Sequence, residues 1–522
     1  MLFIQLFNNR FCLVFLIPFI LGGLSVLMFQ PFNLTFLGFL IIPSLFLLIT
    51  HVCKKSKNIY RKKPYLTNLF YIGFLFGVGF FLSGTYWISY SLTFDENFRY
   101  LIPFSLILIP LFLGVFPGLG TLMIGPFLRN DIGSILIFCS SLSFMDYLRS
   151  KIFTGFPWNL WAYSWSSYAE ILQILNPIGL FSFNLLTLTI FCTPLLLIFK
   201  KKNSLTIFFI LISLFFFNYI YGSYVFNKEE KNYNKLILNK DNSTYIKLIS
   251  PNFDLKYNIS QSELDILVNK LIRYSEPIEA KETIFIWPEG VFTGHTLTEI
   301  KKYKFLFEKK FSKKHIIIFG VNTRDDVTNE YFNTLVAINN SFEVIYRYDK
   351  KKLVPFGEFL PFENFLNKLN LKKITQGSGS FTKGLLQDNL IIGNLNILPL
   401  ICYEIIFTEL SQKSSIETNL IVNISEDAWF GSSIGPHQHF AKAIYRAIES
   451  NTFLVRSANR GISAFINNRG KVIRRLEPNE TGNIELNIPL ITYKLKNRND
   501  LIFFILLFTY IIIFFYIKKK TK

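Results

Sequence analysis

The chain has 522 residues, of which 51% are hydrophobic and 59 are Phe, and its formal net charge is +20. Soluble globular proteins rarely combine these values, so the composition predicts a membrane protein that carries a polar domain. The basic residues gather beside apolar runs and form no stripe with interleaved aromatic residues, which argues against nucleic-acid binding.

Eight uncharged or nearly uncharged runs approach or reach membrane length. A helix rises about 1.5 Å per residue, so roughly 20 apolar residues span a bilayer core. The runs lie at about 11–29, 31–50, 66–90, 101–124, 132–148, 177–199, 204–221 and 501–517. Near the end of the short fifth run, Asp146 is one helical turn from Arg149, and we expect the two to pair. The sequence therefore predicts about eight transmembrane helices, seven in a membrane domain (residues 1–222) and one in residues 500–522.

Three clusters of basic residues predict how the chain crosses the membrane. They lie at 54–63, 200–202 and 518–522, and they contain no acidic residue. Cytoplasmic loops are rich in Lys and Arg, so eight crossings from a cytoplasmic N-terminus to a cytoplasmic C-terminus satisfy all three clusters. The long polar segment then lies outside the cytoplasm. Cleavage of the first run as a signal peptide is not expected, because Gly23-Leu-Ser25 is a poor cleavage site.

The polar segment, residues 243–490, reads as one α/β domain. Runs rich in β-branched and aromatic residues predict strands at 245–249, 283–287, 316–321, 334–338, 395–402, 420–424, 453–457, 462–466 and 484–488. A capping box from Ser260 to Glu263 begins a helix with one apolar face. A second helix begins at about Pro436 and ends near Glu449. Strands that alternate with helices favour sheets covered by helices.

Three positions in this domain carry the groups that acyl transfer through a thioester needs. Cys402 follows an apolar strand, Glu289 stands at a similar strand end, and a lysine triplet occupies 350–352. A thiol can attack a carbonyl carbon, a carboxylate can take the thiol proton, and an ammonium group can stabilise the oxyanion. Each position also has an ordinary interpretation. Cys402 can be read as a buried structural cysteine, Glu289 as a surface acid at the end of a strand, and the lysine triplet as a solvated run of charges.

Two histidines suggest other kinds of site. With Cys402, His437 and His439 could indicate a cysteine protease or a metal pair. They open a helix, where residues two apart point to different faces, so a shared metal ion is not expected. Packing at the helix start or contact with substrate is the ordinary interpretation. We expect neither a metal nor another cofactor.

Several motifs together resemble the carbon–nitrogen hydrolase (nitrilase) superfamily. They are Pro288-Glu289, Tyr348-Asp-Lys350, Leu353-Val-Pro-Phe-Gly-Glu358 and Cys402-Tyr-Glu404. The apolar runs, together with Thr154-Gly-Phe-Pro-Trp-Asn159 and Asp427-Ala-Trp-Phe-Gly431, narrow the resemblance to the bacterial apolipoprotein N-acyltransferase family. The block that begins at Leu353 is highly specific, and the resemblance extends over essentially the whole chain.

The resemblance implies a role for each matched residue. Glu289 corresponds to the family's general base, Lys350 to its essential lysine and Cys402 to its nucleophile. The implied supporting residues are Glu358, Tyr403, Glu404 and Asn333, and the implied lipid-binding residues are Tyr257, Trp429 and Phe430. The implied fold is an α-β-β-α sandwich that faces the periplasm and is carried on eight transmembrane helices.

The resemblance also implies an activity. A fatty acyl group would pass from a membrane phospholipid, through a thioester on Cys402, to the N-terminal amine of a diacylglyceryl-cysteine in an apolipoprotein. The expected partners are these two substrates and membrane lipids, and the chain is expected to be a monomer in the inner membrane. Two other functions stay open, which are a membrane-tethered amidase or nitrilase with water as acceptor and a transporter with an appended polar domain.

Two positions depart from the family pattern. Gly290-Val291 follows Glu289 and has the small residue and the β-branched residue that the family usually has there. Glu426 replaces an asparagine before Asp427, and Tyr257 stands where the family often has tryptophan. None of these departures falls on the three residues matched to the catalytic positions.

Overall fold

The computed structural model describes residues 9–59, 65–199, 201, 203–237, 243–256, 259–361, 380–385, 387–412, 418–490 and 499–520. Two compact units make up the chain. The first contains Met1–Ser89, Tyr100–Phe226 and Arg498–Lys522, and the second contains Tyr90–Arg99 and Asn227–Asn497.

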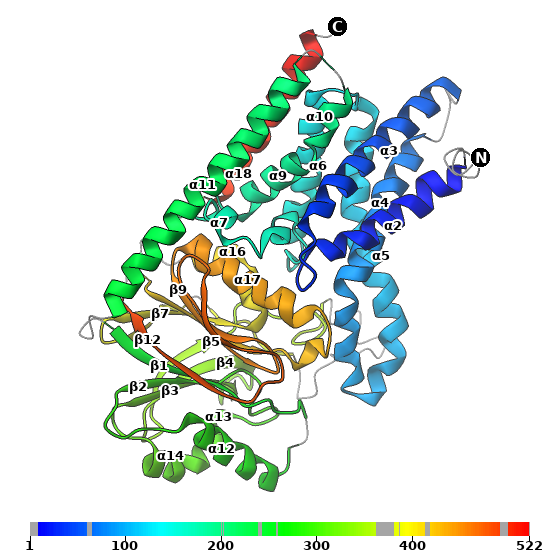
Figure 1. Cartoon of the computed structure of the whole chain (residues 1–522). Coiled ribbons are helices and arrows are strands. Elements are labelled where there is room, and N and C mark those ends of the chain that lie inside the picture. Colours follow the sequence, from blue (N-terminus) through cyan, green and yellow to red (C-terminus); the bar gives the residue numbers. More distant parts are fainter. Residues whose placement is uncertain are drawn as a thin grey trace. The chain divides into compact units, whose positions relative to one another are not determined.

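Apolar helices build the first unit (Figure 1). Among the described residues, seven helical segments are long and apolar enough to cross a membrane, namely Thr35–Lys54, Tyr65–Thr93, Glu96–Phe127, Ile132–Lys151, Leu180–Phe199, Ser204–Lys231 and Asp500–Lys520. Each of them coincides with a predicted apolar run. The first predicted run forms a shorter apolar helix, Cys12–Met28, with a π-helical first turn and a 3-10 last turn. The prediction of a polytopic α-helical membrane domain with about eight helices is confirmed.

Helix α6 (Ile132–Lys151) shows how charged side chains are accommodated in this unit. Asp146 accepts a hydrogen bond from the buried Arg149 at 3.0 Å, as the sequence predicts, and another from Asn184 Nδ2 at 3.0 Å. Arg149 also donates to the carbonyl of Phe156. A charge in a membrane-spanning segment is costly unless it is paired, so this cluster fixes both α6 and the segment that follows it.

The second unit is built on two six-stranded sheets. The first sheet has the order β12-β1-β2-β3-β4-β5, with β1 (Ser243–Ser250), β2 (Thr283–Ile286), β3 (His315–Arg324), β4 (Tyr331–Ile338), β5 (Val344–Asp349) and β12 (Gly482–Pro489). The second has the order β11-β10-β9-β8-β7-β6, with β6 (Leu390–Ile392), β7 (Leu395–Ile401), β8 (Leu420–Glu426), β9 (Phe453–Asn459), β10 (Ser463–Ile466) and β11 (Val472–Leu476). In each sheet three parallel strands lie between antiparallel ones.

Two apolar cores hold the layers of this unit together. Side chains of the first sheet, such as Leu248, pack against side chains of the second, such as Val422. The outer face of the first sheet is covered by α12 (Gln261–Ser275) and α14 (Lys304–Lys310), which bury Val268 and Phe307. Helix α17 (Gly435–Ser450) packs against β9 of the second sheet (Figure 1). The result is an α-β-β-α sandwich, which is the predicted fold class.

Candidate active site

Polar residues gather where several strands of the second unit end. Glu289 lies three residues after β2, Lys350 follows β5 directly, and Cys402 follows β7 directly. Because β2 and β7 belong to the two sheets that face each other, side chains from both sheets meet here. All three of these residues are buried.

Lys350 lies between two carboxylates. Its Nζ is 2.8 Å from Glu358 Oε1 and 3.4 Å from Glu289 Oε1. The side-chain amide of Asn333 donates to the same two oxygens, at 2.6 Å and 2.8 Å. Burial lowers the pKa of Lys350, but the two carboxylates outweigh burial and raise it above its ordinary value. Lys350 is therefore a permanent cation in a buried cluster that also holds two acids.

Cys402 lies close enough to this cluster for its charges to act on the thiol. Burial, together with the charge of Glu289, raises the pKa of the Cys402 thiol well above its ordinary value. Lys350 and a hydrogen bond with Ser425 act in the opposite direction and only partly offset this increase. The resting thiol is thus protonated at neutral pH, and it needs a base before it can attack a carbonyl carbon.

Glu404 fixes the backbone on both sides of this site. Its Oε1 accepts hydrogen bonds from the backbone N–H groups of Lys351 and Lys352, at 2.7 Å and 3.1 Å. Its Oε2 accepts from the N–H of Ile401 and from the hydroxyl of Tyr348, at 2.8 Å and 3.0 Å. The carboxyl group of Glu404 thereby ties the lysine-bearing segment of one sheet to the cysteine-bearing segment of the other.

The remaining predicted residues lie in different places. Tyr403 is half-buried and packs edge to face against Phe407, with ring centroids 5.0 Å apart. Trp429 is half-buried and contacts Phe94 edge to face at 5.4 Å. Phe430 is buried. Tyr257 lies outside the described residues.

Glu426, one of the departures from the family pattern, packs against both Glu289 and Gly290. The backbone N–H of Glu426 donates to Glu289 Oε2 at 3.0 Å. The Glu426 side chain lies against Gly290, so that a Cβ there would be 2.2 Å from Glu426 Oε2. Gly290 also has a φ of +77°, which glycine adopts without strain. Burial raises the pKa of Glu426, which favours a neutral carboxyl group beside Glu289.

Sequence reasoning missed Gly320, on β3. A Cβ at this position would lie 2.9 Å from the Cα of Glu289, closer than side chains tolerate. Only glycine lets β3 approach Glu289 so closely. A glycine within an otherwise apolar strand is the sequence signal that could have identified it.

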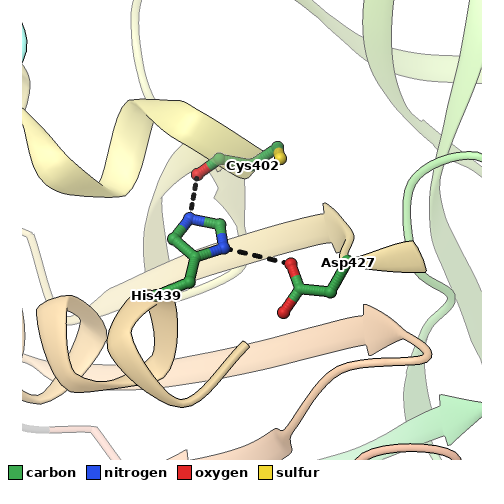
Figure 2. A group of neighbouring side chains, drawn as sticks. All are labelled: Cys402, Asp427 and His439. Carbon is green, nitrogen blue, oxygen red and sulfur yellow. Dashed lines mark hydrogen bonds and ion pairs between the residues drawn. The ribbon is translucent and has the colours of Figure 1, made fainter. Parts of the chain in front are cut away.

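One group of potential metal ligands occurs among the described residues. Cys402, Asp427 and His439 offer donor atoms within 4.8 Å of one another (Figure 2). Arg456 Nη2, however, donates to both Asp427 oxygens, at 2.9 Å and 2.8 Å, and lies 3.0 Å from His439 Nδ1. The guanidinium group already supplies the positive charge that a metal ion would bring, so the group fits a hydrogen-bond network better than a metal centre.

Comparison with known proteins assigns both halves of the chain. Residues 21–192 match the Apolipoprotein N-acyltransferase N-terminal domain, and residues 278–495 match the Carbon-nitrogen hydrolase family. An apolipoprotein N-acyltransferase from Allorhizobium ampelinum is 30% identical over 80% of this chain and 79% of its own length. One from Rhodopseudomonas palustris is 30% identical over 90% of this chain and 88% of its own length. The chain belongs to the apolipoprotein N-acyltransferase family.

Family membership accounts for the two-part architecture. In this apolipoprotein N-acyltransferase family member, the N-terminal match covers helices α3 (Gly38–Ile59) to α9 (Leu180–Phe191) of the apolar part. The carbon–nitrogen hydrolase match covers every residue of the buried cluster from Glu289 to Cys402. The seven span-length apolar helices in the described part of the chain, together with the family, indicate a multi-pass membrane acyltransferase. A solved amidase from Nesterenkonia sp. aligns over 48% of this chain and 91% of its own, with a TM-score of 0.34 and 16% identity.

Proposed function

We propose that this chain transfers a fatty acyl group from a membrane phospholipid to the N-terminal amine of the diacylglyceryl-cysteine of an apolipoprotein. The observation that supports this most is the cluster of Glu289, Lys350 and Cys402 in a family of N-acyltransferases. The apolar helices support it further, because both substrates carry acyl chains that stay in the membrane.

The first half-reaction acylates the cysteine. Glu289 takes the thiol proton while Cys402 Sγ bonds to the ester carbonyl carbon. Lys350 stabilises the negative charge that develops on the carbonyl oxygen. The ester C–O bond then breaks, and the proton on Glu289 passes to the alcohol oxygen of the departing lysophospholipid. Glu358 and Asn333 hold Lys350 and Glu289 in place during these steps.

The second half-reaction forms the amide. The free amine of the apolipoprotein attacks the thioester carbon and gives a proton to Glu289. The C–S bond breaks, and the proton returns to the thiol of Cys402. Only this transfer to an amine distinguishes the acyltransferase from an amidase, which would use water as the acceptor.

The topology follows from the same proposal. The catalytic domain, residues 243–490, lies on the periplasmic side of the inner membrane, between the membrane segments 1–222 and 500–522. Both termini lie in the cytoplasm, where the three basic clusters are favoured. The chain acts as a monomer and needs no cofactor. Trp429, Phe430 and Tyr257 contact the acyl chains.

An acceptor experiment tests the proposal. The purified protein is incubated with phospholipid vesicles and a diacylglyceryl-cysteine peptide that has a free amine, and the products are read by mass spectrometry. We expect the peptide to gain one fatty acyl mass, and an N-acetylated control peptide to gain none. Release of free fatty acid with neither peptide modified would contradict the proposal and favour the amidase.

A further inference from the structure

Cys402 has an unusual backbone conformation. Its φ is +47°, which is the left-handed region that residues with a side chain rarely adopt. Such a conformation is strained and persists only where surrounding contacts hold it. Cys402 is the first residue of the short helical segment Cys402–Ile406, directly after β7. Its backbone conformation therefore determines the direction in which its own side chain points.

One contact that holds this backbone comes from His439 on α17. His439 Nε2 lies 3.3 Å from the carbonyl oxygen of Cys402. A carbonyl oxygen can only accept, so Nε2 carries the proton and donates it. Figure 2 shows the imidazole ring beside this carbonyl, with the hydrogen bond reaching the carbonyl oxygen of Cys402. The hydrogen bond from His439 therefore acts on the backbone of the cysteine.

The other ring nitrogen is fixed by buried charges. Asp427 Oδ1 and Arg456 Nη2 each lie 3.0 Å from His439 Nδ1, so this nitrogen faces one acceptor and one donor. Burial and the Arg456 charge lower the pKa of His439 to about 4, so the ring is neutral at physiological pH. Asp427 holds Arg456 through both of its carboxylate oxygens. Asp427 and Arg456 together therefore hold the ring with Nε2 toward the Cys402 carbonyl.

We propose that His439 is a positioning residue for the acyl transfer, and that its Nε2–H holds the Cys402 carbonyl so that the thiol faces Glu289 and Lys350. The role in transfer to an apolipoprotein rests on the function proposed above, whereas the effect on the reactivity of Cys402 does not. Phe430 packs edge to face on the same ring at 5.3 Å, which restricts the ring's orientation further.

Three substitutions at one position separate this role from a packing role. In H439Q the amide nitrogen reaches the place of Nε2, so donation to the Cys402 carbonyl is kept. In H439N the side-chain oxygen can still accept from Arg456, but the amide is too short to reach the carbonyl. H439L fills the space and has no donor. H437N, at the half-buried histidine on the same helix, is the matched control.

The measured quantity is the burst of p-nitrophenol released from the p-nitrophenyl ester of a fatty acid, which reports acylation of Cys402 whatever the acceptor. We expect the burst rate constant to fall about a hundredfold in H439N and H439L, as expected for a displacement of about 1 Å. The ester concentration at which the burst rate constant is half-maximal should change by less than about twofold, since positioning affects the chemical step more than it affects binding. H439Q should recover to within about tenfold of wild type, and H437N should equal it.

Two results would overturn the proposal. One is a folded H439N protein, by circular dichroism and thermal unfolding, that retains the wild-type burst. The other is an H439Q protein that is as slow as H439L. A wild-type protein that shows the burst and its dependence on His439, yet never acylates the lipopeptide, would instead refute the proposed function and leave this inference standing.

Discussion

Lys350, Lys351 and Lys352 are adjacent in the sequence and have different surroundings. Lys350 is buried against Glu289 and Glu358, and Lys352 is partly exposed and paired with Glu409 at 3.2 Å. Lys351 lies 4.9 Å from the centroid of the Tyr348 ring. A run of lysines carries no pattern that shows which member is buried, so only the motif spacing selected Lys350. The structure supports that choice, and the catalytic role stays a prediction.

Replacing these lysines one at a time tests the choice. K350M should lower the rate of Cys402 acylation by about a hundredfold or more, because the oxyanion loses its cation. It should also destabilise the fold by roughly 3–5 kcal/mol, because two buried carboxylates lose their partner. K352M, the matched control, removes a partly exposed ion pair and should cost less than about 1 kcal/mol with acylation unchanged. Equal effects of the two substitutions on the acylation rate would contradict the assignment.

The thiol of Cys402 gives a pH prediction. Its raised pKa means that the thiolate fraction at neutral pH is smaller than that of an ordinary cysteine. Alkylation by iodoacetamide follows the thiolate, so the rate at Cys402 should keep rising with pH beyond about 9, where an ordinary thiol of pKa about 8.5 approaches its plateau. The rate is measured by mass spectrometry of the Cys402 peptide in folded protein. A plateau at or below pH 8 would show that the resting thiol is already ionised.

At the scale of elements, the sequence predicted the interior of the sandwich better than its edges. All nine predicted strands and both predicted helices are present. The strands that were missed are β5, β6 and β11, and each lies at the edge of a sheet. Charged residues interrupt two of these strands, Arg347 and Asp349 in β5 and Arg474 and Arg475 in β11, so they lack the apolar run that marks an interior strand. Strand β6 is apolar but has only three residues, fewer than the runs that predict a strand.

The side-chain geometry of the site was less predictable than its strands. Motifs identified Glu289 and Cys402 without showing that Asn333 bridges two carboxylates or that His439 reaches the Cys402 carbonyl. Those contacts join residues that are between 25 and 44 positions apart and lie on different elements. They depend on how β4 and α17 pack against neighbouring strands, which residue spacing alone does not determine.

The close approach of β3 to Glu289 leads to an element-scale prediction. G320A should push the Glu289 backbone away by a few tenths of an ångström and lower turnover roughly tenfold or more. Ala337, on the adjacent strand β4, offers a matched control. A337G should destabilise the fold by about 1 kcal/mol without moving Glu289, so turnover should stay near wild type. Turnover in G320A equal to that in A337G, at similar thermal stability, would contradict the argument.

At the scale of the whole molecule, composition and basic clusters predicted a polytopic membrane protein with a separate polar domain. The described residues contain seven span-length helices and one shorter helix, where eight spans were predicted. The shorter apolar helix, Cys12–Met28, belongs to the first run and ends before the turn that contains Pro31. Hydropathy gives the extent of an apolar run, whereas local turn chemistry determines how much of it is helical.

Single exposed cysteines test the proposed topology. The five native cysteines are buried, so an added exposed cysteine should dominate labelling by an impermeant maleimide. V327C lies at a position that is 91% exposed in the second unit, and K54C lies in the first basic cluster. We expect labelling of V327C and protection of K54C in intact spheroplasts, with both labelled after lysis. Protection of V327C together with labelling of K54C would invert the orientation.

The central claim is that the acyl group passes through a thioester on Cys402. The most direct measurement is the intact mass of the purified protein after incubation with phospholipid and no acceptor. We predict a gain of one fatty acyl mass on Cys402, its removal by neutral hydroxylamine, and its discharge onto an added diacylglyceryl peptide with a free amine. C402S should gain no such mass, because a hydroxyl group is poorly activated by a carboxylate. No adduct on the wild-type protein under any of these conditions would contradict the mechanism.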